Sequence, residues 1–140
     1  MDFYLQKAIF YQETNLKGTV LPFEIQEKEE YLHFYEINPR HSNSIEPAQR
    51  QFLGDLVFIG KKSSDETENG KQVALPKGNY LFTQQRSEKP LSQADWLNLA
   101  IEQQKDGLWE RNKLENSLYI RFLFEDGKAV TQIFRPVQSN

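Results

Sequence analysis

The sequence predicts a single α+β domain over residues 1–140, in which an antiparallel sheet packs against one main helix and one short helix. Several short runs of β-forming residues alternate, a segment from residue 92 has helical spacing, and two final runs flank Asp126-Gly127. The two halves can be interpreted as pseudo-repeated strand–helix–strand–strand units, about 1–60 and 72–137, joined by a polar loop over 61–71.

Composition excludes several classes of function. The chain has no cysteine, which excludes disulfides, thiolate metal sites and cysteine nucleophiles. A net charge of −3 with both signs interspersed leaves no basic stripe for a nucleic acid. No apolar run approaches the roughly 18 residues of a membrane span, and the amino terminus lacks the pattern of a signal peptide. We therefore expect a cytoplasmic protein with no nucleic-acid or membrane partner.

The first half predicts strands and one short helix. Runs rich in β-branched and aromatic residues indicate the strands. These runs are residues 2–12, 18–25, 29–37 and 55–60. The short helix is expected over 46–53, with Ser44 as its N-cap and Gly54 at its end. Acidic runs at 27–30 and 65–68 are interpreted as solvated.

The second half begins with a strand within residues 72–85, after a turn at 76–78. The main helix is predicted over 92–106 from apolar residues at helical spacing. Ser92 and Asp95 resemble a capping box, and Gly107 is expected to end the helix.

The last two runs predict a β-hairpin, because Asp-Gly between alternating runs favours a two-residue turn. The turn then places Glu125 opposite Lys128 and, counting back, Tyr119 opposite Phe134. One face of the hairpin is almost entirely apolar and should pack under the helix. This face consists of Leu118, Ile120, Phe122, Phe124, Ala129, Thr131 and Ile133.

The opposite face of the hairpin carries Arg121 and Gln132 among rings and aliphatic side chains. Such a face suits a half-apolar cavity with a few placed polar groups. It equally suits a solvent face on which Arg121 lies flat on a ring. The strand over 29–37 offers a second aromatic surface. The candidate ligand-binding residues are Tyr31, His33, Tyr35, Tyr119, Arg121, Gln132 and Phe134. Two histidines without a carboxylate cluster predict no metal site, and no cofactor is expected.

The stretch Pro76-Lys77-Gly78-Asn79-Tyr80, followed by a strand, a Trp-containing helix and two strands ending in Phe-Arg-Pro-Val, carries a resemblance to a known family. Residues 75–137 resemble the second half of a GyrI-like small-molecule-binding domain, also called the effector-binding domain of multidrug-sensing regulators. The resemblance implies an aromatic-lined cleft between two repeats. Members often have a pocket glutamate that attracts cationic drugs. Here Arg121 holds the central polar position, which favours a neutral or anionic ligand.

Three functions follow as hypotheses. The first is a stand-alone ligand-binding domain, since the chain has no helix–turn–helix. The second is a small hydrolase using the same cleft, with Glu36 or His33 as base and a tyrosine as donor; a carboxylate beside a tyrosine hydroxyl in the cavity would favour it. The third is a protein-interaction module acting through a sheet edge or an aromatic patch, with which a homodimer is compatible. No catalytic residue is assigned.

Overall fold

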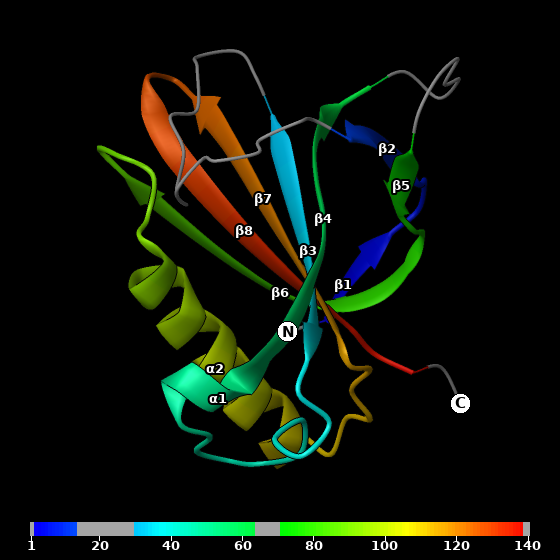
Figure 1. Ribbon diagram of the computed structural model, residues 1–140, viewed down its shortest axis with the longest axis vertical. Helices are drawn as coiled ribbons and strands as arrows, with labels where there is room; N and C mark the ends of the chain where they lie inside the picture. Colours follow the sequence, from blue (N-terminus) through cyan, green and yellow to red (C-terminus); the bar gives the residue numbers. More distant parts are fainter. Residues whose placement is uncertain (1, 14–29, 64–70, 139–140) are drawn as a thin grey trace.

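The computed structural model describes residues 2–13, 30–63 and 71–138 (Figure 1). Within these ranges the chain forms an eight-stranded antiparallel sheet and two helices, which confirms the α+β class. The helices are α1 (Gln49–Phe52) and α2 (Gln93–Trp109). The strands are β1 (Asp2–Leu5), β2 (Ile9–Glu13), β3 (Tyr31–Ile37), β4 (Leu53–Lys62), β5 (Gln72–Leu75), β6 (Gly78–Ser87), β7 (Ser117–Glu125) and β8 (Lys128–Pro136). Neither helix is long and apolar enough to cross a membrane.

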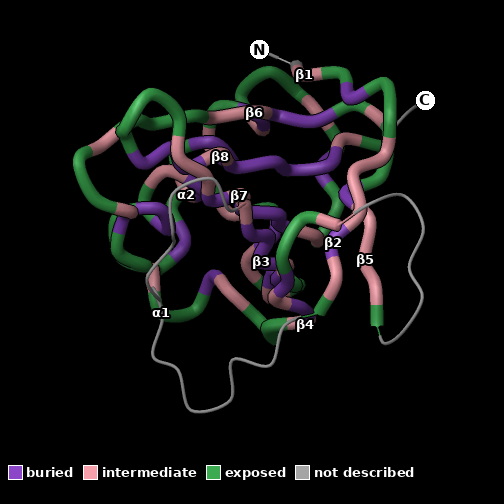
Figure 2. The backbone as a smooth tube through the Cα atoms, turned by 90° about the horizontal axis from the view of Figure 1, so that it is seen from above, coloured by how far each residue is buried: buried purple, intermediate pink, exposed green. Residues whose placement is uncertain are grey.

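The sheet curls into a half-barrel. Its strand order is β1-β6-β8-β7-β3-β4-β2-β5. Short segments of chain connect the two edges of the sheet. Strand β1 at one edge leads into β2 near the other edge, and β5 at that other edge leads into β6, the neighbour of β1. The pairs continue across both junctions, with Leu5 opposite Gly78 and Ile9 opposite Leu75. Seen from above, β2 and β5 lie across from the helices, with buried stretches of β8, β7 and β3 between them (Figure 2).

The prediction of one continuous strand over residues 2–12 is wrong, because this segment forms two strands, β1 and β2. A break at residues 6–8 lets the chain leave its partner β6 and pair with β4 and β5 instead. The strand expected after the turn at 76–78 is present as β6, and a separate short strand, β5, precedes this turn, where Pro76 has no backbone N–H for the ladder. The strand predicted over 55–60 extends to Leu53–Lys62 and takes in the start of the predicted polar loop. The strand expected over 18–25 lies outside the described residues.

Helix α2 covers one face of the sheet. Its predicted N-cap is confirmed, because the Ser92 hydroxyl accepts a hydrogen bond from the backbone N–H of Asp95 at 3.2 Å. Trp96, Leu97 and Ala100 pack against the sheet and exclude water from this face. We call the resulting cluster the helix-side core. Its strand and α1 residues are Tyr31, Tyr35, Ile37, Phe52, Leu118, Ile120, Phe122 and Ile133.

Two predictions about helix ends are wrong. Gly107 lies inside α2, where it packs so closely that a Cβ atom would overlap with the Leu81 side chain. The chain turns instead at Arg111, whose φ of 64° is left-handed. Helix α1 has only four residues, begins after Ala48 without a side-chain cap, and passes directly into β4 at Leu53.

The predicted hairpin is confirmed in register and in faces. Tyr119 pairs with Phe134 and Glu125 with Lys128. Asp126 and Gly127 both have positive φ, 53° and 77°, as a type I′ turn requires. The apolar face packs under α2 as expected. The pseudo-repeat of the two halves is not confirmed, since the sheet order places strands of each half between strands of the other.

A second cluster fills the inside of the curl. It takes one buried residue from each strand, which is possible because the sheet encloses this face. We call it the inner core. Its members are Leu5, Tyr11, Leu32, Phe58, Leu75, Tyr80, Tyr119 and Phe134.

Candidate ligand site

The seven candidate residues do not line one cleft. Directly paired residues of neighbouring strands point to the same face, and β3 pairs with β7 so that Tyr31 meets Phe122 and Tyr35 meets Leu118. The three β3 candidates therefore join the helix-side core or pack against it, whereas Tyr119 and Phe134 belong to the inner core. Arg121 and Gln132 share that inner face, since they alternate with residues directed toward α2. The predicted common cleft is corrected to two separate surfaces.

His33 is buried rather than placed at a cavity. Its side chain is 2% exposed, and its ring lies 4.7 Å from the Phe122 ring, centroid to centroid. Burial lowers the pKa of His33 to about 3, so its imidazole is neutral at physiological pH. Glu36, the other candidate base, is exposed on β3. Neither residue lines the described cavities.

The buried state of His33 predicts an acid-sensitive stability. The unfolded chain binds a proton near pH 6.5 and the native protein only near pH 3, so the free energy of unfolding should fall as pH drops through this window. The expected slope from this residue approaches roughly 1.4 kcal/mol per pH unit. Urea unfolding at several pH values should show a shallower acid limb for His33→Phe, but not for the control His41→Gln. An unchanged limb in His33→Phe would contradict the prediction.

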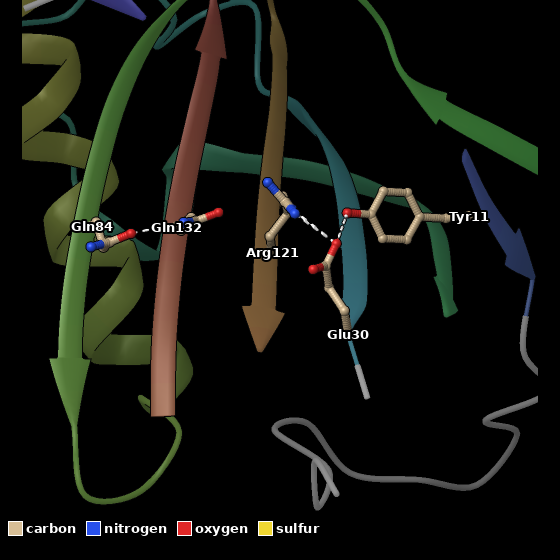
Figure 3. A network of polar contacts seen from close by, with 5 residues as sticks. All are labelled: Tyr11, Glu30, Gln84, Arg121 and Gln132. Atoms are coloured by element: carbon tan, nitrogen blue, oxygen red, sulfur yellow. Dashed lines mark hydrogen bonds and ion pairs between the residues drawn. The ribbon is translucent and has the colours of Figure 1, made fainter. Parts of the chain in front are cut away.

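Arg121 is held by a carboxylate inside the curl (Figure 3). Its Nη2 and Nε atoms donate to Oε2 of Glu30 at 2.7 and 3.2 Å. The Tyr11 hydroxyl donates to the same oxygen at 2.6 Å. The side chains of Arg121 and Glu30 are each only 13% exposed. The guanidinium also lies over the Phe134 ring, 5.7 Å from its centroid.

This triad consists of an ion pair and a protonated phenol. Burial alone disfavours the charge of Arg121, but Tyr11 and Glu30 outweigh that effect and raise its pKa. Burial is also the main cause of the raised pKa of Tyr11. Arg121 therefore has its counter-ion within the protein, and the expectation of an anionic ligand at Arg121 loses its basis. Glu30 was missed because it ends a run of charged residues that was interpreted as solvated.

Gln132 lies beside Arg121 on the inner face, because the two residues are directly paired across β7 and β8. Its Nε2 atom donates to Oε1 of Gln84 at 2.7 Å (Figure 3). Its own Oε1 atom is buried and accepts no hydrogen bond from the described part of the chain.

A cavity of about 410 Å³ opens near the end of the inner core, beside the turn that joins β5 to β6. Of the candidate residues, Tyr119 lines this cavity, together with the whole stretch 76–80. Tyr4, Tyr80 and Tyr119 contribute three phenol rings, and Lys77 and Glu115 contribute one charge of each sign. We call this space the tyrosine cavity.

Local conformation fixes one wall of the tyrosine cavity. Gly78 has a φ of 152°, which a residue with a side chain rarely adopts, and so permits the turn into β6. The Tyr80 hydroxyl donates to the carbonyl oxygen of Pro76 and ties the strand back to this turn. Burial, with smaller effects from Tyr119 and Glu115, raises the pKa of Tyr80, so the phenol remains a donor.

Tyr119 presents the other hydroxyl. Its side chain is buried, with 7% of the residue exposed, and no described residue forms a hydrogen bond with its hydroxyl. Burial and the nearby charge of Glu115 raise the pKa of Tyr119 to about 12. The hydroxyl is therefore protonated at neutral pH and can donate a hydrogen bond into the cavity.

A scan against protein-family models and a search among curated proteins each find no match for this chain. The resemblance to GyrI-like domains stays a prediction. The stretch that carried it does line the tyrosine cavity, and it was the sequence signal that could have led to Lys77 and Tyr80.

Proposed function

We propose that the chain is a small-molecule-binding domain whose ligand occupies the tyrosine cavity. The observation that carries the proposal is the Tyr119 hydroxyl, a protonated donor in a cavity and without a partner in the described part of the chain. A donor at the wall of a cavity can form a hydrogen bond with an acceptor of a ligand, and such a bond contributes about 1 kcal/mol to binding. The volume of about 410 Å³ falls in the usual range of small-molecule sites.

The inner core holds the Tyr119 ring in place for this role. Phe34 stacks on it with 4.5 Å between ring centroids, and Tyr80 meets it edge to face at 6.4 Å. Packing on two sides leaves the ring little rotational freedom. A donor fixed before binding loses less entropy on binding than a mobile one.

Removing the Tyr119 hydroxyl should weaken ligand binding about tenfold, the loss expected for one hydrogen bond of about 1.4 kcal/mol. The measurement is a thermal-shift and NMR screen of small polar aromatic compounds on the whole chain, followed by titration of the hits into Tyr119→Phe. Tyr35→Phe is the matched control, because Tyr35 is equally buried and its pKa is also raised to about 12 by burial, but it lies in the helix-side core. Equal affinity in Tyr119→Phe and wild type would contradict the proposal.

A small hydrolase is the second candidate, and one observation favours it. The carboxylate of Glu115 lines the tyrosine cavity and acts electrostatically on both Tyr80 and Tyr119. A general base beside a phenol donor is a usual arrangement for activating water. Hydrolysis of activated esters that is lost in Glu115→Gln would support this candidate, and binding without turnover would exclude it for the compounds tested.

A further inference from the structure

The tyrosine cavity contains opposite charges that do not neutralise each other. Lys77 lies in the turn before β6, and Glu115 lies shortly before β7. Both are exposed, and neither forms an ion pair within the described ranges. Each is therefore available to a charge brought in by a ligand.

Hydrogen bonds fix the backbone at Glu115 and at the neighbouring wall of the cavity. The N–H of Glu115 donates to the Pro136 carbonyl at 3.0 Å. The carbonyl of Glu115 accepts a hydrogen bond from Nε of Arg135 at 2.5 Å. On the opposite wall, the N–H of Val137 donates to the Asn79 carbonyl at 3.0 Å. These bonds leave the Glu115 carboxylate as the part of this residue that is not used by the fold.

We propose that the ligand is a zwitterion of amino-acid size, whose carboxylate pairs with Lys77, whose ammonium group pairs with Glu115, and whose apolar part packs on the tyrosine rings. This inference rests on the proposed binding function. A purely cationic ligand would be repelled by Lys77 and a purely anionic one by Glu115, whereas a zwitterion gains from both charges. The Tyr119 hydroxyl adds a donor for the ligand carboxylate.

The test compares three probes that share one ring but differ in charge. They are phenylalanine, phenethylamine, which lacks the carboxylate, and N-acetylphenylalanine, which lacks the ammonium group. Titrations followed by NMR on the whole chain should show phenylalanine binding about three- to tenfold more tightly than either analogue, the effect expected of one partly exposed ion pair.

Charge-removing variants assign each end of the ligand. Lys77→Gln should weaken phenylalanine and N-acetylphenylalanine but not phenethylamine, and Glu115→Gln should weaken phenylalanine and phenethylamine but not N-acetylphenylalanine. Lys89→Gln and Glu102→Gln, which change exposed charges outside the cavity, are the controls. The proposal is supported if each variant weakens binding only of those probes that carry the charge opposite to the one removed.

The remaining outcomes each overturn it. Phenethylamine binding as tightly as phenylalanine would indicate an organic cation, and N-acetylphenylalanine doing so would indicate an anion. If no probe binds but a neutral compound binds in a way that depends on Tyr119, the zwitterion inference fails and the proposed function stands. If no compound of any charge binds, both fail.

Discussion

Replacing Arg135 with methionine is expected to lower the free energy of unfolding by roughly 3–5 kcal/mol. Arg135 is almost fully buried and donates to three acceptors that water cannot reach easily. These are Oε1 of Gln104 at 2.7 Å, the Glu115 carbonyl at 2.5 Å and the Ser42 carbonyl at 3.4 Å. Methionine preserves much of the length but leaves all three acceptors without their donor.

The loss should extend beyond these contacts, because Gln104 is a shared partner. Its Nε2 atom donates to the carbonyls of His41 and Ser44 at 2.9 and 2.6 Å, so Arg135 and Gln104 together attach the loop before α1 to α2 and β8. Burial lowers the pKa of Arg135 to about 10, which leaves it charged at neutral pH although its described acceptors are uncharged.

Urea unfolding followed by Trp fluorescence measures this effect. Arg86→Met is the matched control, since Arg86 is exposed on β6 and pairs with exposed Glu125, an interaction worth less than about 1 kcal/mol. Equal stability of the two variants would contradict the role assigned to Arg135.

Replacing Glu30 with alanine is expected to lower the free energy of unfolding by roughly 2–4 kcal/mol. This loss is smaller than the one expected for Arg135→Met, because the pair of Glu30 and Arg121 is not completely buried. The change leaves the Arg121 guanidinium inside the curl without a counter-ion, and it removes the acceptor of the Tyr11 hydroxyl. The energetic cost comes from the unpaired charge more than from the lost attraction.

A double-mutant cycle separates these two effects. Adding Arg121→Met to Glu30→Ala removes the unpaired charge, so the double variant should be more stable than the sum of the two single changes predicts. Glu125→Ala, which breaks an exposed pair, should cost less than about 1 kcal/mol. Strict additivity of Glu30→Ala and Arg121→Met would show that the two side chains do not interact in solution.

Local patterns predicted the parts of the fold that depend on neighbours in sequence. Asp126-Gly127 specified the hairpin and its register, and Ser92 specified the start of α2. The alternation within β3 and within β7 was also correct, strand by strand. The prediction that all seven candidate residues line one cleft was wrong, because it depended on the register of β3 against β7. No short-range pattern in the sequence encodes that register.

Other errors have the same physical origin. Gly107 has the sequence signature of a helix end, but its function is to let α2 approach Leu81, a contact set by tertiary packing. Glu30 reaches Arg121 across most of the chain, so its place in a charged run gave no indication that it is buried. The break at residues 6–8 contains neither glycine nor proline, and the need to change partner strands accounts for it.

The pairing of β1 with β6 and of β2 with β5 affects the rate at which the sheet folds. Strand β1 pairs only when Asp2 meets Leu81, and β2, which also pairs with β4, gains its second neighbour only when Ile9 meets Leu75. Such distant pairings are slow to form, because a long loop must close before any contact rewards it. During synthesis, β1 and β2 leave the ribosome long before these partners exist. The tyrosine cavity, which includes Tyr4 in its wall, should therefore be among the last features to appear as the protein folds.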